Sequence, residues 1–365
     1  MNNLTIALAS LGVLVLVALG VHGVWSARSA ARKQLATRQA RHAPPGAPGG
    51  ADAFTEQADV GDAGDSLARA VAGAAGGDGL RAKRQAARIE ALIDAIATLS
   101  VDAPVSGEQL MAHLPGSWRA GSKPFLIEGL DAASGQWEPL LPGQIYGQHY
   151  GELQAGVQLA NRSGAINEIE YSEFVQTLQR FADALGATIE FPDMLDVVAR
   201  GRELDAFAGQ HDAQLAVHLN ARSAAWSVGY VVQHASRHGF VPGAVAGRLV
   251  LPAGEDGAPP VVTLSFDANA ALAALADDPQ RSVVRDVTLS FDVPQTDPRF
   301  APFVAWQASA RALSLGMDAA IVDDQGQPID ESGFATIGAE LDLVYANLRE
   351  RDLAAGSLAA RRLFS

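Results

Sequence analysis

The sequence contains no cysteine, and this absence removes several kinds of chemistry at once. None of the 365 residues is cysteine. Disulfide bonds, catalysis by a thiolate, and zinc or iron–sulfur sites with cysteine ligands are therefore excluded. A reducing compartment suits such a composition. The length leaves room for one large domain or two ordinary ones, because domains usually span roughly 100 to 200 residues.

Basic residues are also scarce. The chain has 27 Lys and Arg against 41 Asp and Glu, a net charge of -14. This balance argues against a nucleic-acid partner, because affinity for phosphate backbones depends on clustered Lys and Arg. The basic residues that are present gather just after an N-terminal hydrophobic segment, at Arg28, Arg32, Lys33, Arg38 and Arg41.

That hydrophobic segment, Leu4 to Trp25, has no Asp, Glu, Lys or Arg. Its length reaches the roughly 30 Å of a bilayer core at about 1.5 Å per residue. A cleaved signal peptide is the alternative, but it needs a basic start, and the chain begins Met1-Asn2-Asn3. We expect residues 1–27 to be a single transmembrane anchor that contacts inner-membrane lipid through residues 4–25. The basic cluster after it predicts a periplasmic N-terminus and a cytoplasmic C-terminal side.

A linker follows the anchor. Residues 43–78 are rich in Ala, Gly, Pro and Asp, and such a segment buries too little apolar area to fold. We therefore expect a flexible tether over residues 28–79. From Leu80 to Leu99 apolar residues recur at helical spacing, which predicts a helical connector over residues 80–121.

The C-terminal part predicts an α+β fold. Apolar and polar residues alternate in 214–219, 262–267 and 287–293, as in strands with one buried and one open face. Helices between them have candidate first residues or caps at Ser223, Asp297 and Asp330. One of these helices should end at Gly239 and another at Gly316. An antiparallel sheet with helices packed on one face follows.

The middle segment, residues 122–210, has a similar pattern. We expect a strand at 156–162, a helix with an Asn167–Glu170 capping box, a strand at 188–191 and a helix at 194–207. Glu173-Phe174-Val175 parallels Pro302-Phe303-Val304 at the start of a later helix. The pattern indicates a related half-unit that precedes the C-terminal domain.

Catalytic patterns are sparse. Asp323-Asp324-Gln325-Gly326 is typical of a turn. His211-Asp212 has no accompanying nucleophile motif. His234 and His238 are four residues apart, but the glutamate of a metalloprotease motif is missing between them. We expect no catalytic residue, no metal, no cofactor and no small-molecule substrate, and hence no enzyme.

From about Asp212 to Leu348 the chain resembles the C-terminal FtsZ-binding domain of the ZipA family. Three segments carry the resemblance: Val287 to Pro294, the helix from Phe303 to Leu313, and Ala320 to Gln325. The N-terminal anchor and the Pro-rich linker add to it. The C-terminal domain would then span residues 211–350, with a tail at 351–365.

The resemblance implies a bacterial cell-division adaptor. It would hold FtsZ polymers at the inner membrane during septum assembly, by binding the C-terminal peptide of FtsZ on the open sheet face. The residues expected to receive this peptide are Gln214, Ala216, His218, Val245, Arg248, Val250, Thr288, Ser290 and Asp292. This face is more polar than the family's apolar face. Either the peptide docks with more hydrogen bonds, or its site lies nearer the middle segment.

Two other functions remain open from the sequence. Sheets with helices on one side also bind RNA, but they do so with aromatic residues on a basic surface. A small-ligand domain would instead show a deep pocket with clustered titratable groups.

Overall fold

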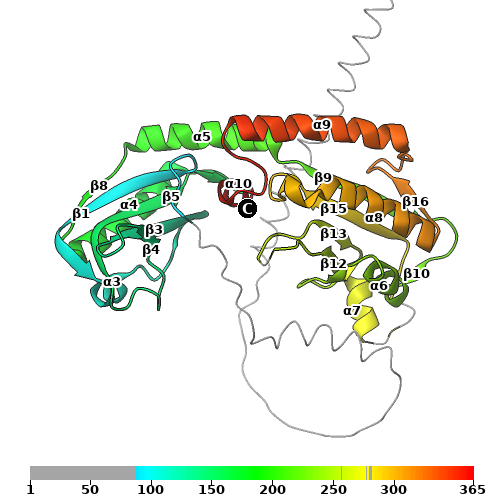
Figure 1. Ribbon diagram of the computed structural model, residues 1–365, viewed down its shortest axis with the longest axis horizontal. Coiled ribbons are helices and arrows are strands. Elements are labelled where there is room, and N and C mark those ends of the chain that lie inside the picture. Colours follow the sequence, from blue (N-terminus) through cyan, green and yellow to red (C-terminus); the bar gives the residue numbers. More distant parts are fainter. Residues whose placement is uncertain (1–87, 256, 277, 279–281) are drawn as a thin grey trace, which may run out of the picture. The chain divides into compact units, whose positions relative to one another are not determined.

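The computed structural model describes residues 88–365 except 256, 277 and 279–281. These residues form two six-stranded antiparallel sheets with helices, and two small two-stranded sheets, β6–β7 and β10–β14, so the α+β class is confirmed (Figure 1). The expected anchor and linker, residues 1–79, lie outside the described residues. Over the described part of the chain, no helix combines the length and the apolar character needed to cross a bilayer.

The first sheet belongs to residues 88–211, which we call the first half. Its strands lie in the order β2–β3–β5–β1–β8, and β4 also pairs with β3. The elements are β1 (Asp94–Ser106), α3 (Gly107–His113), β2 (Arg119–Ala120), β3 (Lys123–Asp131), β4 (Trp137–Pro139), β5 (His149–Gln158), β6 (Ala160–Asn161), β7 (Gly164–Ala165), α4 (Glu168–Leu185), β8 (Thr188–Glu190) and α5 (Met194–His211).

Helix α4 supplies the core of the first half. Its stripe Phe174, Leu178 and Phe181 is buried against the inner face of the sheet, which includes Phe125 and Leu153. The rings of Phe125 and Phe174 meet edge to face with centroids 5.6 Å apart. The Asn167–Glu170 capping box that the sequence predicts is present and fixes the start of this helix.

The second sheet belongs to residues 212–350, the second half, and has the strand order β11–β12–β13–β15–β9–β16. The elements are β9 (Gln214–Ala221), β10 (Trp226–Ser227), α6 (Val228–Ser236), β11 (Val241–Pro242), β12 (Arg248–Leu251), β13 (Val262–Ser265), α7 (Ala268–Leu275), β14 (Val283–Val284), β15 (Asp286–Asp292), the 3₁₀ turn η1 (Pro298–Phe300), α8 (Pro302–Met317), β16 (Ala319–Val322) and α9 (Glu331–Glu350).

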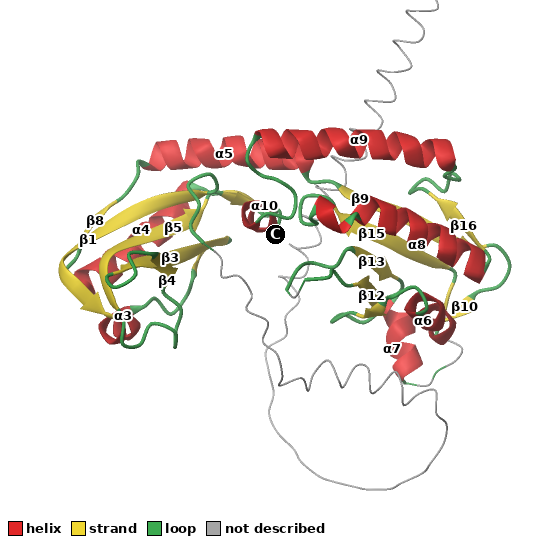
Figure 2. Ribbon diagram, in the orientation of Figure 1, coloured by secondary structure: helices red, strands yellow, loops and turns green. Residues whose placement is uncertain are grey.

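Helices cover the inner face of the second sheet (Figure 2). Trp306 of α8 is fully buried at the centre, and its Nε1 donates to the Leu289 carbonyl at 2.9 Å. Val231 of α6 and Phe334 of α9 join the same core. The predicted alternation in β9, β13 and β15 is therefore confirmed, with one face of each strand committed to packing.

The two halves share one topology. Strands β3, β5, β1 and β8 have the same order as β13, β15, β9 and β16, and every pairing is antiparallel. In both halves a helix follows the first strand, another precedes the last strand, and a third follows it. The expected half-unit is thus a complete repeat of the architecture that begins at β1.

Helices α4 and α8 are equivalent, but their residues align about one helical turn away from the alignment that the sequence predicts. Both helices end at a residue in the left-handed region, Gly186 (φ 66°) and Asp318 (φ 52°). Counted from these caps, the buried residue opposite Phe174 is Trp306 rather than Phe303. The predicted alignment paired Phe174-Val175 with Phe303-Val304 because the residue types are the same. In the structure, the equivalent residues are those that point into the core, Phe174 and Trp306.

The predicted helix from Leu80 to Leu99 is wrong over its described part. Residues from Asp94 onward form strand β1, in which Ala95, Ala97 and Leu99 point inward and are buried. Two of these inward positions are alanine, so the alternation typical of a strand is weak in the sequence. The larger Ile93 and Ile96 instead give an apolar spacing typical of a helix. Residues 80–121 are therefore not a helical connector, because β1 and α3 belong to the first half.

Three expected helix ends also differ. Ser227, not Ser223, caps α6 by accepting from the Tyr230 backbone N–H. Asp297 caps only the turn η1, and α8 starts after Ala301 without a side-chain cap. Its end is Asp318 rather than Gly316. Asp330 caps α9 as expected.

The expected tail at 351–365 is folded. It contains α10 (Leu358–Leu363), whose Ala360 and Leu363 are buried with Phe364. These residues share a cluster with Ile93 of the first half and Leu348 of α9. The C-terminal residues therefore pack with both halves.

Candidate peptide-binding face

The face of the second sheet opposite its core is the site that the sequence predicted. We call it the outer face. It consists of two rows of cross-strand neighbours, Arg248–Ser265–Thr288–His218 and Val250–Thr263–Ser290–Ala216, with the further pair Asp292–Gln214.

Eight of the nine predicted residues lie on this face, since the register of β12, β13, β15 and β9 brings them into the same rows. Val245 does not. It lies in the turn before β12, is 54% exposed, and its carbonyl accepts from the Arg248 backbone N–H. Ser265 and Thr263 also belong to the face. The alternation in β13 would have identified them, because they point opposite to the buried Val262 and Leu264.

A hydrogen-bonded chain of three side chains crosses the outer face. His218 Nε2 lies 2.8 Å from Asp324 Oδ1, and His218 Nδ1 lies 3.1 Å from Thr288 Oγ1. With its proton on Nε2, the ring donates to the carboxylate and accepts from the hydroxyl. A hydroxyl, an imidazole and a carboxylate in this order resemble an activated nucleophile.

Catalysis also requires donors aimed at the developing oxyanion. Thr288 lies in the central strand β15, which pairs with β13 on one side and β9 on the other. The backbone N–H groups around Thr288 therefore form hydrogen bonds within the sheet. The two hydrogen bonds hold Thr288, His218 and Asp324 together as one polar patch. The predicted turn at Asp323 is confirmed, because its carboxylate accepts from the backbone N–H groups of Gln325 and Gln327.

Two hollows border the outer face. One, of about 590 Å³, is lined by His218, Asn220 and Asp324 among others. The other, of about 360 Å³, is lined by Ser265 and Thr288. Both include Arg285 and Asp286. The face is therefore contoured, with charges of both signs at its edge.

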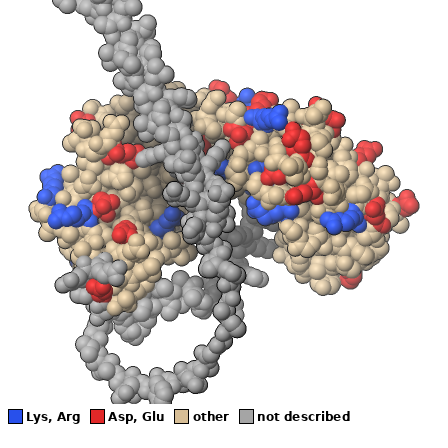
Figure 3. Space-filling view, turned by 180° about the vertical axis from the view of Figure 1, so that it is seen from behind, with Lys and Arg blue, Asp and Glu red and all other residues tan. Residues whose placement is uncertain are grey.

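Charges on the surface seen in Figure 3 are mixed. Acidic and basic side chains alternate with uncharged areas instead of forming a broad basic patch. On the outer face itself, Arg248 lies in β12 and Asp286 at the start of β15. This distribution suits a peptide with polar groups better than a polyanion.

Asp292 has a structural partner. Arg162, in the turn between β6 and β7, contacts Asp212 and Asp292, with an Nη2–Oδ2 distance of 2.6 Å to Asp292. Burial raises the pKa of Asp292 despite the opposing effect of Arg162. The predicted role of Asp292 in peptide binding thus competes with a link between the two halves.

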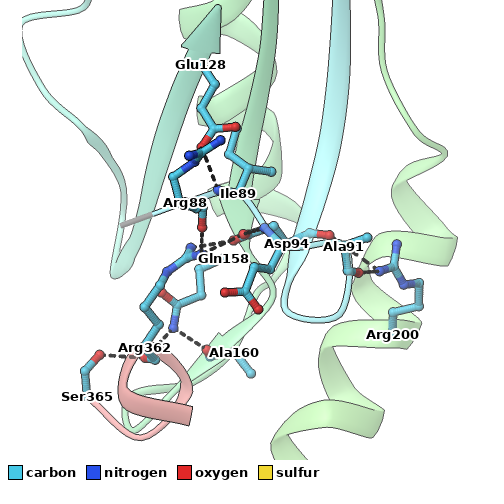
Figure 4. A network of polar contacts seen from close by, with 11 residues as sticks. Arg88, Ile89, Ala91, Asp94, Glu128, Gln158, Ala160, Arg200, Arg362 and Ser365 are labelled. Carbon is cyan, nitrogen blue, oxygen red and sulfur yellow. Dashed lines mark hydrogen bonds and ion pairs between the residues drawn. The ribbon is translucent and has the colours of Figure 1, made fainter. Parts of the chain in front are cut away.

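A second polar network surrounds Asp94 (Figure 4). Arg362 of α10 donates to both carboxylate oxygens of Asp94, at 2.6 and 2.8 Å, and the Asp94 side chain is fully buried. Gln158 donates to the carbonyls of Ala160 and Arg362, both at 2.7 Å. Every donor and acceptor here faces another part of the chain, so the network is structural.

The outer face of the first sheet is covered by residues 88–93. Glu128 accepts from Arg88 Nε and from the Ile89 backbone N–H, both at 3.0 Å. A Cβ atom on Gly156 would lie 2.8 Å from Ile89 Cγ2, so only glycine allows this segment to lie so close.

His234 lies in α6, whereas His238 lies two residues after the end of that helix. The ring of His234 lies against that of Tyr230 in a tilted arrangement, with centroids 4.3 Å apart, and burial, together with Arg237 and His238, lowers the pKa of His234. In the described ranges, no three His, Asp or Glu side chains come together as metal ligands.

No protein-family model matches the chain, and no curated protein is significantly similar to it. The resemblance to the ZipA family therefore rests on the sequence features quoted above.

Proposed function

We propose that the protein is a membrane-tethered adaptor whose outer face binds the C-terminal tail of FtsZ and so links FtsZ polymers to the inner membrane. The observation that supports this most is the predicted residues' alignment in cross-strand rows on one sheet face. The hydrophobic segment from Leu4 to Trp25 would supply the tether.

The first half supports the idea that such a face accepts a chain segment. There, residues 88–93 lie over the corresponding face, and a sheet carboxylate, Glu128, binds a backbone N–H of that segment. The second half has the same strand order. Its polar rows, including the half-buried Thr288 and Thr263, offer similar hydrogen-bonding groups to an extended tail.

A single tail would bind weakly. A short peptide buries less than the roughly 1,200 Å² of a stable interface. Many tails on one polymer, facing many tethered copies, would raise the overall affinity by avidity. Weak and exchangeable contacts suit an assembly that is built and dismantled repeatedly.

RNA binding has less support. Two aromatic residues that could have stacked on bases are Phe266, which follows β13 directly, and Phe291 of β15. Phe291 is buried at 2% exposure, and Phe266 packs against the core of the second half. Their position leaves the rows of the outer face without a stacking platform.

The test is binding of a fluorescent FtsZ tail peptide to the full chain in detergent micelles, measured by anisotropy. Ala216→Glu places a bulky charge in the middle of the outer face and should weaken binding at least tenfold, which is about 1.4 kcal/mol. Val304→Glu is the control, because Val304 is 62% exposed on α8.

Equal binding of a scrambled peptide would refute the proposal. So would equal affinity of Ala216→Glu and Val304→Glu, provided that circular dichroism shows both variants to be folded.

A further inference from the structure

A hollow of about 610 Å³ lies where the end of α9 meets α10. Its lining includes Tyr345 and Arg349 of α9, Arg361 of α10, and Arg299 of the turn η1. Small-molecule sites commonly enclose about 300 to 1,000 Å³. The hollow is distinct from the outer face, since the two share no lining residue.

Unsatisfied polar atoms gather at this hollow. Among the described residues, the buried side-chain atoms without a hydrogen-bond partner are Thr296 Oγ1, the Tyr345 hydroxyl and Arg361 Nε. Tyr345 and Arg361 line the hollow, and Thr296 precedes Asp297, which lines it too. An unsatisfied buried donor costs about 1 to 3 kcal/mol, so native proteins rarely keep one without a bound partner. Their concentration indicates a ligand that accepts hydrogen bonds.

The arginines of the hollow differ in their pairing. Arg299 is neutralised by Glu255 and Asp297, at 2.7 and 2.8 Å. Within residues 88–365 as described, the side chains of Arg349 and Arg361 have no ion pair or hydrogen bond. Two guanidinium groups are thus available to an anion.

The Tyr345 hydroxyl is a donor at neutral pH. Burial raises the pKa of Tyr345 to about 12, with smaller effects from Asp342 and Asp297. The remaining acid of the hollow is Glu90. Burial raises the pKa of Glu90, the nearby Asp94 adds to this rise, and Arg362 opposes it. The hollow therefore offers a neutral hydroxyl donor and the two guanidinium groups of Arg349 and Arg361, beside the carboxyl group of Glu90.

We propose that this hollow binds a phosphorylated small molecule, with its phosphate on Arg349, Arg361 and the Tyr345 hydroxyl. Two unpaired guanidinium groups balance a phosphate dianion, whereas a carboxylate would neutralise only one of them. Pro298 and Leu358 provide apolar wall for the organic part. The proposal departs from the expectation that the protein has no small-molecule ligand.

The phosphate could belong to a free phosphomonoester or to a lipid headgroup, and the experiment separates these sources. The full chain in dodecyl maltoside micelles is titrated calorimetrically with inorganic phosphate, with glycerol 3-phosphate, and with micelles that carry phosphatidic acid. We expect glycerol 3-phosphate to bind more tightly than inorganic phosphate, because it also fills the apolar wall.

Two variants test the site. Tyr345→Phe removes a hydroxyl without an intramolecular partner, so it should leave the fold intact and weaken binding at least tenfold. Arg349→Gln should do the same. Tyr230→Phe and Arg311→Gln are the matched controls, since the hydroxyl and the guanidinium there contact Gly316 and Glu331. Both controls should stay within twofold of the parent protein.

Preference for phosphatidic acid with the same dependence on Tyr345 and Arg349 would support the site and assign its phosphate to a lipid. Absence of binding by all three ligands at about 1 mM would overturn the proposal. Binding unaffected by Tyr345→Phe and Arg349→Gln would overturn it as well, since the phosphate would then lie elsewhere on the chain.

Discussion

Buried polar residues determine where segments of the first half meet. Lys123 is 1% exposed and donates to Ser122 Oγ at 2.7 Å and to Asn161 Oδ1 at 2.9 Å. Burial lowers the pKa of Lys123, while Glu170 and Asp205 oppose that effect. Glu170 accepts from both the hydroxyl and the backbone N–H of Ser122. These bonds tie the start of α4 to the turn before β3.

Glu170 should therefore matter more than its neighbour Glu168. Glu170→Gln should lower the free energy of unfolding at pH 7 by about 2 kcal/mol, because it weakens several hydrogen bonds to a charged group. Glu168→Gln disrupts only the exposed pair with Arg202 and should cost less than about 1 kcal/mol. Urea denaturation of both variants measures the difference, and equal losses would contradict this role.

The effect of Glu170→Gln should also depend on pH. Burial opposes the charge of Glu170, but the hydrogen bonds from Ser122 outweigh it and the pKa of the carboxyl is lowered from 4.5. The unfolded state then takes up its proton first as the pH falls. The stabilisation is complete above pH 4.5 and is lost as the pH falls through the lowered pKa, where the variant and parent should converge.

At the scale of elements, the two sheets repeat one arrangement with different side chains. Helix α4 ends at Gly186 with φ 66°, and α8 ends at Asp318 with φ 52°. A left-handed residue allows the chain to turn from the helix into the last strand of the sheet. Glycine adopts this conformation without strain, whereas other residues do so less readily.

Gly186→Ala should destabilise the protein by about 1 kcal/mol because of its backbone conformation. Gly209→Ala is the matched change in the last turn of α5. A Cβ atom meets nothing within 4 Å at either position, and only Gly186 has a positive φ. Gly209→Ala should stabilise the protein by up to about 1 kcal/mol. Thermal unfolding should shift in opposite directions, and shifts of the same sign would disprove the explanation.

In the second half, the sequence predicts the helices and strands whose large apolar residues recur with a clear period. Strands β9, β13 and β15 and the helices α8 and α9 follow from such patterns. Strand β1 was missed, because alanine at positions 95 and 97 faces the core and gives little contrast with its neighbours. The repeat of the fold was only partly visible for the same reason, since β1 and β9 bury residues of different size.

The rows of the outer face could be predicted once the strands were known, since alternation determines which side chains share a face. Arg162 could not. It reaches Asp292 across 130 residues of sequence, and no local pattern encodes that contact. The hollow at Tyr345 likewise depends on the packing of residues 351–365, which the sequence predicts only as a C-terminal tail.

For the whole molecule, Arg162 links the two halves. Arg162→Gln would leave Asp212 and Asp292 close together without their cation. We expect a loss of about 2 to 3 kcal/mol in unfolding free energy at pH 7. Arg202→Gln, at an exposed pair, should cost less than about 1 kcal/mol.

Adding Asp292→Asn to Arg162→Gln should recover part of this loss, because one of the two facing charges disappears. A double-mutant cycle in urea measures the coupling. Strictly additive effects of the two substitutions would show that the ion pair does not join the halves.

The pair of Asp94 and Arg362 has a consequence for synthesis on the ribosome. Its two residues are 268 positions apart, and an emerging chain tends to fold from its N-terminal side first. In the nascent first sheet, the Asp94 carboxylate therefore lacks its cation until Arg362 has left the exit tunnel. Because Arg362 follows every strand of both sheets in the sequence, the charge of Asp94 is neutralised only after both sheets have been synthesised.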